Sequence, residues 1–366
     1  MKKLYYSFLL LFAIASCHDK NTDSDIFNGE IKINEDTIIQ QEIEFKELVF
    51  QDPNFGEIAI QDSLAFFMNP KLSTHWYQVF DLNNNAEIGR YVNKGNGHKE
   101  FSPIAPIFNF YIENNETKTV LFEANKERIS VWNITKSLTN KSTVIEKQIK
   151  MPWMQENNGA CFNEIFVKDS CTVYAKVSAI STENQDATLP YYQIRDLRNG
   201  EKKSEIHVFK KDILDKKTKY QPEVFYSHDV IKPDGSKIAQ AMLHVPQINI
   251  IDTKSGTAVA YQLNYHMTLS DLETYEDLKT YFIRICADNE YIYTVFYGKE
   301  PWGLYDIPCV NQIYIFDWDG NLIKKILTKH CIDHIAVDHV NKILYTTSPM
   351  DEKLYYIKTN ELIGKN

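Results

Sequence analysis

The sequence lacks the short motifs that mark the commonest hydrolases. It has no Gly-x-Ser-x-Gly nucleophile elbow and no His-Glu-x-x-His zinc motif. Its ten histidines are scattered, and His330 and His334 share a segment of strand character, so they do not line one helix face. These absences leave no catalytic residue that a motif can assign.

Basic residues are too few to indicate a nucleic-acid-binding protein. Lys and Arg number 40 against 49 Asp and Glu, which gives a net charge of −9, and we see no basic stripe. We therefore expect no nucleic acid among the partners of this protein.

Cysteine is scarce and shows no metal-ligand spacing. Five cysteines follow Cys17, namely Cys161, Cys171, Cys286, Cys309 and Cys331. An exported protein permits one disulfide among them, but the odd count does not say which pair forms it. The other thiols are expected to be small buried apolar groups in strands, as Ile285-Cys286-Ala287 indicates.

One long apolar run is present, Leu4 to Ala15, and it follows Lys2 and Lys3. It is too short for a mature membrane-spanning helix and reads as a secretory signal. Its end, Ile14-Ala15-Ser16-Cys17, resembles the bacterial lipoprotein signal, in which the cysteine becomes an acylated N-terminus. The alternative is an ordinary cleaved signal with a chance cysteine.

These features predict three parts of the chain. Residues 1–16 are a lipoprotein signal peptide, residues 17–37 a flexible lipid-anchored tether, and residues 38–360 the folded domain. Acyl chains of the palmitate kind on Cys17 would supply stable membrane anchoring at the cell envelope, because they give more than one lipid signal. The sequence does not decide between the periplasmic face and the cell surface.

What the mature chain has in quantity is strand-forming residues. Hydrophobic residues make up 43% of the sequence and aromatic residues 13%, with 22 Tyr and 20 Phe. Gly and Pro are few, with 13 and 12 residues. This composition favours a large core built from strands.

A repeated pattern then indicates how the strands are organised. Five times an apolar run ends in a short Asp/Asn/Gly turn before a second run, at residues 79–89, 131–135, 194–201, 250–257 and 315–322, with a fainter copy at 356–360. Self-similarity at roughly 40–65 residues is typical of a β-propeller. The prediction is an all-β, six-bladed β-propeller; seven blades remain possible if Leu269 to Thr280 contains strands.

The last predicted blade has three strands before the chain ends. The extended segment Ile38 to Leu48 stands ahead of the first blade, and we expect it to supply the missing outer strand and close the ring. Phe209 to Tyr220 and Leu269 to Thr280 have helix-like charge patterns and are expected as surface insertions.

The segment Gly89 to Phe101, together with the signal, Cys17 and the six blades, resembles the TolB-like six-bladed propeller lipoproteins of Bacteroidetes. In that group a Gly-x-Gly-Pro-x-Glu-Phe-like turn follows the first repeat, and here His98 replaces the proline. The resemblance implies a fold and an envelope location but no enzymatic activity. The glycines are expected to serve a tight turn, since no P-loop lysine and Ser/Thr follow to bind phosphate.

One set of polar residues recurs at a fixed place in the inner strands. Five positions before the Asp or Asn that ends each strand stand Glu57, Asn109, Glu164, Asp229, Ile283 and Asp333, and all but Ile283 are polar. Inner strands line the channel of a propeller, so these positions are expected to form a ring. Arg284, His334 and His228, next to the ring, would offset part of its charge. Such a ring can bind Ca²⁺ or a cationic or hydroxyl-rich ligand, or it can simply end strands at a solvated channel mouth.

Two functions follow from this ring. The first is a non-enzymatic binding or scaffolding module for an envelope protein or glycan, with Trp153, Trp302, Tyr305 and His98 as contact candidates on loops. The alternative is a calcium-dependent, lactonase-like hydrolase that uses Glu57, Asn109 and Asp229 in the channel.

Overall fold

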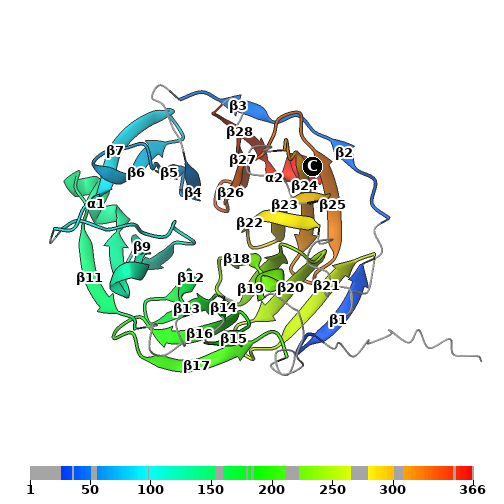
Figure 1. Cartoon of the computed structure of the whole chain (residues 1–366). Helices are drawn as coiled ribbons and strands as arrows, with labels where there is room; N and C mark the ends of the chain where they lie inside the picture. The colour runs from blue at the N-terminus through cyan, green and yellow to red at the C-terminus, as the bar shows by residue number, and fades with distance from the viewer. Residues whose placement is uncertain are drawn as a thin grey trace, which may run out of the picture.

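Six blades of four antiparallel strands surround a central axis, as the predicted propeller requires, and two of the six sheets gain a fifth, parallel strand (Figure 1). The computed structural model describes residues 26–34, 37–50, 56–97, 99–152, 160–178, 180–182, 185–210, 222–264, 279–300, 308–348 and 352–364. In these residues no helix is long and apolar enough to cross a membrane.

Each of the first three blades runs outward from an inner strand. Blade 1 contains β4 (Glu57–Gln61), β5 (Leu64–Met68), β6 (His75–Asp81) and β7 (Ala86–Asn93). Blade 2 contains β8 (Tyr111–Glu113), β9 (Glu116–Glu123), β10 (Arg128–Asn133) and β11 (Ile145–Lys150). Blade 3 contains β12 (Phe162–Asp169), β13 (Thr172–Val177), β16 (Tyr191–Asp196) and β17 (Lys202–His207), with the hairpin β14 (Ile180–Thr182) and β15 (Gln185–Thr188) inserted.

The remaining blades follow the same order. Blade 4 contains β18 (Ser227–Ile231), β19 (Lys237–Met242), β20 (Gln247–Asp252) and β21 (Ala258–Leu263). Blade 5 contains β22 (Thr280–Ala287), β23 (Tyr291–Lys299), β24 (Gln312–Asp317) and β25 (Leu322–Leu327). Blade 6 contains β26 (His334–Asp338), β27 (Ile343–Ser348) and β28 (Lys353–Lys358), and its fourth strand comes from the N-terminal part of the chain.

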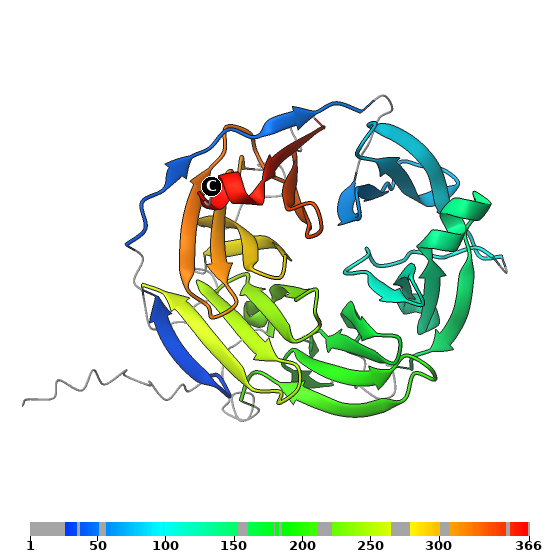
Figure 2. The same ribbon diagram turned by 180° about the vertical axis from the view of Figure 1, so that it is seen from behind.

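That fourth strand is β3 (Lys46–Leu48), which pairs antiparallel with β28 and places Leu48 opposite Leu354. The prediction that Ile38 to Leu48 completes the last blade is therefore confirmed. The same stretch also contains β2 (Gln41–Glu42), which pairs parallel with β25 of blade 5. We call residues 26–48 the N-terminal strap, because Figure 2 shows its strands following the rim of the ring.

The strap begins earlier than the sequence predicted. Residues 30–34 were assigned to the flexible tether, but they form β1 (Glu30–Asn34), which pairs parallel with the outer strand of blade 4. Burial explains the difference, because Ile31 is 3% exposed and Phe27 packs edge-on against Phe209. Short apolar side chains and an unpaired strand edge are enough to order this segment.

Helices are few among the described elements. They are η1 (Ala124–Lys126), α1 (Ile134–Asn140), η3 (Pro222–Phe225) and α2 (Thr359–Ile363). The sequence indicated a turn at Val131 to Thr135, but the chain enters α1 there instead. The reason is an N-cap, since Asn133 Oδ1 accepts the Lys136 N–H at 2.8 Å.

The repeated Asp turns have a structural cause. In the turns after β6, β16, β20 and β24, the Oδ1 of Asp81, Asp196, Asp252 and Asp317 accepts the backbone N–H two residues later, at 2.9–3.0 Å. A side chain that bonds its own backbone in this way holds the chain in a turn. The pattern that revealed the propeller is therefore a pattern of turns and carries no chemistry of its own.

The glycine-rich turn after blade 1 is likewise structural. Gly95 has a φ of +142°, and a Cβ built on it would lie 2.0 Å from Glu100 Oε2. The same Oε2 accepts the Gly97 N–H at 2.8 Å. A carboxylate of the chain itself thus occupies this turn, which excludes a phosphate from the same N–H group.

Neighbouring blades pack through large apolar side chains. Trp132 of blade 2 is 1% exposed and contacts Phe66, Tyr77 and Tyr91 of blade 1. Burying each such side chain stabilises the fold by about 1.5–3 kcal/mol before cavity effects. These interfaces hold the blades in register around the channel.

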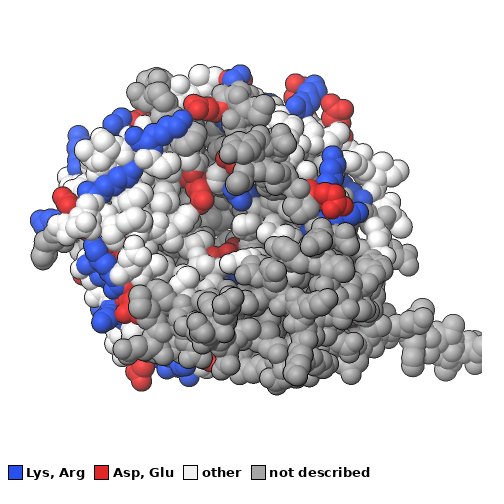
Figure 3. All heavy atoms as spheres, viewed as in Figure 1, with Lys and Arg blue, Asp and Glu red and all other residues white. Residues whose placement is uncertain are grey.

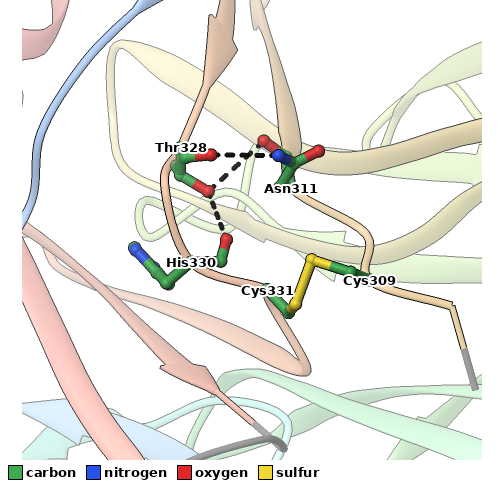
Figure 4. The surroundings of a disulfide bond; sticks show 5 residues. All are labelled: Cys309, Asn311, Thr328, His330 and Cys331. Carbon is green, nitrogen blue, oxygen red and sulfur yellow. Dashed lines mark hydrogen bonds between the residues drawn. A yellow bond between two sulfur atoms is a disulfide. The ribbon is translucent and has the colours of Figure 1, made fainter.

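A disulfide joins blades 5 and 6. Cys309 precedes β24, Cys331 precedes β26, and the two Cα atoms are 4.8 Å apart (Figure 4). Beside it, Asn311 Nδ2 donates to the Thr328 carbonyl at 3.0 Å. The sequence allowed one bridge without naming it. Of the other thiols, Cys286 is buried as expected, whereas Cys161 and Cys171 are partly exposed.

Candidate functional site

The ring of polar residues divides into three parts in the structure. Glu57 begins β4, Glu164 lies in β12, Asp229 in β18, Ile283 in β22, and Asp333 directly precedes β26; Asn109 lies two residues before β8. The common register is therefore close to the one that the sequence indicated. The partners of each residue differ, however, and those partners decide what each part of the ring can do.

Asn109 joins two blades. Its Nδ2 donates to the Val167 carbonyl at 2.7 Å, and its Oδ1 accepts the Val167 N–H at 2.9 Å. The amide thus copies the hydrogen bonding of a strand backbone and fastens the start of blade 2 to β12. This arrangement gives Asn109 a structural role.

Glu164 and Asp229 belong to a buried group at the interface of blades 3 and 4. Lys176 of β13, 1% exposed, places its Nζ 3.0 Å from Asp229 Oδ2 and 3.5 Å from Glu164 Oε1. The same ammonium donates to the Ser227 carbonyl at 2.7 Å. Tyr192 donates its hydroxyl proton to Asp229, which also accepts from Gln240. We call Glu164, Lys176, Tyr192 and Asp229 the sealed group.

Burial sets the protonation of the sealed group. Loss of solvation, reinforced by the Asp229 carboxylate, raises the pKa of Glu164 despite the nearby Lys176 ammonium. The pKa of Lys176 is raised, because Asp229 and Glu164 outweigh the effect of its burial. Burial therefore favours the neutral form of Glu164, while its neighbours favour the charged form of Lys176.

The open part of the ring is a row of four side chains from three blades. Arg284 Nη2 lies 3.7 Å from Asp333 Oδ1, His334 Nδ1 lies 3.0 Å from Asp333 Oδ2, and His334 Nε2 lies 3.8 Å from Glu57 Oε1. Cation and anion therefore alternate in the order Arg284, Asp333, His334, Glu57, which we call the charge row. The Glu57 side chain is 50% exposed and that of Asp333 43%.

Contacts within the charge row favour the ionised forms of Asp333, Glu57 and His334. The His334 side chain is the main cause that lowers the pKa of Asp333. Burial alone would raise the pKa of Glu57, but His334 and Arg284 outweigh it, so this pKa is also lowered. Burial alone would lower the pKa of His334, and its two carboxylate neighbours reverse that shift upward.

His228 lies between the two groups. Burial is the largest cause that lowers its pKa, to about 4, and the positive charges of Arg284 and Lys176 act in the same direction. His228 is therefore neutral at neutral pH and does not add a charge to the ring.

The charge row lines a pocket of about 460 Å³. Its other walls include the apolar Met68, Pro70 and Pro106 and two further residues of opposite charge, Glu352 and Lys353. The rest of the inner strands enclose a second cavity of about 430 Å³ along the ring axis, lined mostly by apolar residues of all six blades. Figure 3 shows one face of the ring, with charged side chains of both signs around a hollow near its middle.

The residues proposed for calcium do not converge as one set of ligands. Asn109 is engaged by Val167, Asp229 by Lys176 and Tyr192, and Glu57 by His334. Among the described residues, no three His, Cys, Asp or Glu side chains are grouped to hold a metal ion. Residues at the same register of a propeller lie on different blades. Each of them therefore contacts the side chains and backbone nearest to it, and the three do not share one ligand.

Several predicted positions lie outside the described residues. These are the lipidation candidate Cys17 and the loop residues His98, Trp153, Trp302 and Tyr305. They stay predictions.

Sequence reasoning missed Lys176 and Tyr192, which come from the second and third strands of blade 3. One signal was available for the lysine. Val173-Tyr174-Ala175-Lys176-Val177 places a cation in an otherwise apolar strand, and a buried ammonium requires a carboxylate partner. Only the fold identifies that partner as Asp229.

Comparison with known proteins agrees with the architecture. A family described as TolB-like 6-blade propeller-like matches residues 234–340. A member of the DUF4221 family from Bacteroides vulgatus has a similar structure, with 14% identity, a TM-score of 0.58, and coverage of 87% of this chain and 96% of that chain. A candidate exported protein from Bacteroides fragilis also has a similar structure, with 12% identity, a TM-score of 0.51, and coverage of 86% of this chain and 88% of that chain. No curated protein matches the sequence. The resemblance to TolB-like six-bladed propellers is confirmed, and the structural likeness concerns the fold.

Proposed function

We propose that this protein is a binding module of the bacterial cell envelope, held there by a lipid on Cys17, and that its partner is a protein or a glycan. The partner binds at the pocket that contains the charge row. The observation that carries the proposal is this pocket, in which four charged side chains from blades 5, 6 and 1 face a wall of apolar residues. Specific polar groups in an apolar recess are the usual composition of a ligand site.

The arrangement of the charges supports recognition over catalysis. Both ring nitrogens of His334 face carboxylates, at 3.0 Å and 3.8 Å, so the imidazole is held within a row of alternating charges. A general base must instead reach the proton that it removes from a substrate or nucleophile. Alternating, partly exposed charges are suited to matching the charges of a partner.

The envelope location is supported by the N-terminal sequence and by the strap. Leu4 to Ala15 and Cys17 have the order of a lipoprotein signal. The first described residue, Ile26, is nine residues after Cys17, and nine extended residues span at most about 30 Å. A lipid on Cys17 would therefore hold the rim of blade 4 close to the membrane.

Two measurements test the proposal. Metabolic labelling with a palmitate analogue is expected to modify the wild-type protein and not Cys17→Ala, and label retained in that variant would remove the anchor from the proposal. Pull-down from envelope extracts with the wild type is expected to recover a partner that the double variant Arg284→Gln, Asp333→Asn does not recover. A partner that binds both proteins equally would place recognition elsewhere on the molecule.

A further inference from the structure

The contacts within the charge row leave much of its hydrogen-bonding capacity unused. The separations of 3.7 Å between Arg284 and Asp333 and of 3.8 Å between His334 and Glu57 are too long for hydrogen bonds. The 3.0 Å contact between His334 and Asp333 is the one of hydrogen-bond length. Arg284 and Glu57, the two ends of the row, therefore interact with the other members of the row through charge attraction and not through hydrogen bonds.

The Arg284 end is suited to an anion. Its Nη1 donates to the Ile283 carbonyl at 2.9 Å, which fixes the guanidinium, and its side chain is 34% exposed. A guanidinium has five N–H donors in a planar fork that matches a carboxylate. A ligand carboxylate can therefore approach Arg284 without displacing the Ile283 bond.

The Glu57 end is suited to a cation. Its side chain is the most exposed of the row, and its pKa is lowered, so it carries a negative charge at neutral pH. An ammonium group is a compact cation with three donors and fits such a carboxylate.

Charge balance restricts the ligand further. With His334 protonated, two cations and two anions cancel in the row, and Lys353 and Glu352 add one charge of each sign to the pocket, so a ligand of large net charge of either sign gains little. A ligand with a carboxylate at one end and an ammonium at the other matches both ends. Met68, Pro70 and Pro106 offer apolar contact to the part between them.

We infer that the pocket binds a short peptide with both ends free, its C-terminal carboxylate on Arg284, its N-terminal amine on Glu57 and its apolar side chains against Met68 and Pro106. This inference rests on the proposed function and specifies its ligand class. The distance between the terminal amine and the terminal carboxylate is longer in a peptide than in a single amino acid. A series of peptide lengths therefore distinguishes a peptide ligand from a free amino acid.

The test is calorimetry of the full mature protein in detergent with leucine and its peptides of two to four residues. Each peptide is also prepared with an acetylated N-terminus and with an amidated C-terminus. Blocking either end is expected to weaken binding by about tenfold or more, since each removes one charge-assisted interaction. The inference is overturned if blocked and free peptides bind alike, if only the single amino acid binds, or if nothing binds.

Two variants assign the ends. Arg284→Gln is expected to make binding indifferent to amidation while acetylation still weakens it, and Glu57→Gln is expected to give the reverse. Arg90→Gln is the matched control, because Arg90 pairs with Glu87 on the outer strand of blade 1, and it should bind as the wild type does. Loss of the same end-dependence in both variants would also overturn the assignment.

The outcomes separate this inference from the proposed function. If an envelope partner depends on Arg284 and Asp333 but no peptide binds, the ligand class is wrong and the binding site stands. If peptides bind with the expected end-dependence but no envelope partner is captured, the pocket chemistry stands and the scaffolding role does not.

Discussion

The sealed group and the charge row occupy the same register of the inner strands, yet one is closed to solvent and the other is open. Their side chains differ accordingly, since Asp229 is fully buried while Asp333 is 43% exposed. The sealed group takes its cation from a second strand, Lys176 of β13, whereas the charge row takes both cations, Arg284 and His334, from inner strands. Position in the repeat therefore does not by itself make a binding site.

The neighbouring strand explains the contrast. The Lys176 ammonium reaches between blades 3 and 4 and pairs with one oxygen of each carboxylate, Asp229 Oδ2 and Glu164 Oε1, which stabilises that interface. In the charge row no such second-strand cation is present among the described contacts, so its carboxylates remain directed at a pocket. We expect the sealed group to govern stability and the charge row to govern binding.

The largest effect is expected from breaking the sealed group. Asp229→Ala removes the carboxylate that lies 3.0 Å from the buried Lys176 ammonium and leaves Glu164 at 3.5 Å, and removal of one partner of a buried pair costs about 3–5 kcal/mol. Urea denaturation of the variant should show this loss in the free energy of unfolding. Asp333→Ala is the control in the charge row.

A double variant separates the loss of a charge partner from the loss of packing. Lys176→Met with Asp229→Leu replaces the pair by apolar groups and is expected to recover most of the lost free energy, since buried pairs often exchange for apolar residues at little cost. Equal destabilisation by Asp229→Ala and Asp333→Ala would contradict the division between the two groups.

The disulfide gives the next largest effect and acts on the side of the charge row. Cys309 and Cys331 are 22 residues apart, and a bridge of this span contributes roughly 3 kcal/mol in the chain-entropy treatment. Cys331 precedes Asp333 by two residues, and the bridge joins the blade of Arg284 to that of Asp333. Cys309→Ser with Cys331→Ser is therefore expected to lower stability and also to weaken partner binding in the pull-down. Unchanged binding would show that the blades keep the row aligned without the bridge.

His228 provides an intermediate effect that involves both groups. Its pKa falls from the ordinary value of 6.5 to about 4 in the folded protein. The folded state thus resists protonation, so the contribution of neutral His228 is complete above pH 6.5 and is lost as the pH falls toward 4. By linkage the loss at pH 4.5 is about 3 kcal/mol. His334 has the opposite sign, because its raised pKa favours the folded state below pH 6.5 and this contribution disappears as the pH rises through the raised value.

Unfolding measured at pH 7 and pH 4.5 tests this prediction. His228→Gln should lose less stability than the wild type on acidification, and the difference reports the histidine. His207→Gln is the matched control, since His207 is on the outer strand of blade 3 and pairs with Glu205. The same acid sensitivity in wild type and His228→Gln would assign the effect to other groups.

The sequence predicted the architecture well because its signals are local. Turn residues such as Asp81 and Asp252 accept hydrogen bonds from the backbone N–H two residues later. Their pattern can therefore be recognised in the sequence without any tertiary contact being known. The strand Lys46–Leu48 was also foreseen, from the count of strands in the last blade. The parallel pairing of Glu30–Asn34 was not, because that segment is short, polar at alternate positions and ordered by an edge that only the fold creates.

The sequence predicted where the site residues lie in the repeat, but it did not predict which residues they contact. The register identified Glu57, Glu164, Asp229 and Asp333 as inner-strand residues, but their roles depend on contacts across blades. Asn109 became a backbone mimic because Val167 of the next blade is opposite to it. Distances of this kind arise from blade packing, which a linear pattern does not encode.

The smallest effect on stability is expected in the charge row itself, and it is the sharpest test of the contrast. Glu57→Gln and Asp333→Asn remove charges that are about half exposed. Glu57 lies 3.8 Å from His334, and Asp333 lies 3.0 Å from His334 and 3.7 Å from Arg284. Exposed pairs of this kind contribute about 0–1 kcal/mol, because solvent screens them and side-chain order offsets the attraction. Urea denaturation should therefore place both variants within about 1 kcal/mol of the wild type, while the pull-down and calorimetry show weakened binding. If either variant is as unstable as Asp229→Ala, the charge row stabilises the fold as the sealed group does, and the proposal that it serves ligand binding is contradicted.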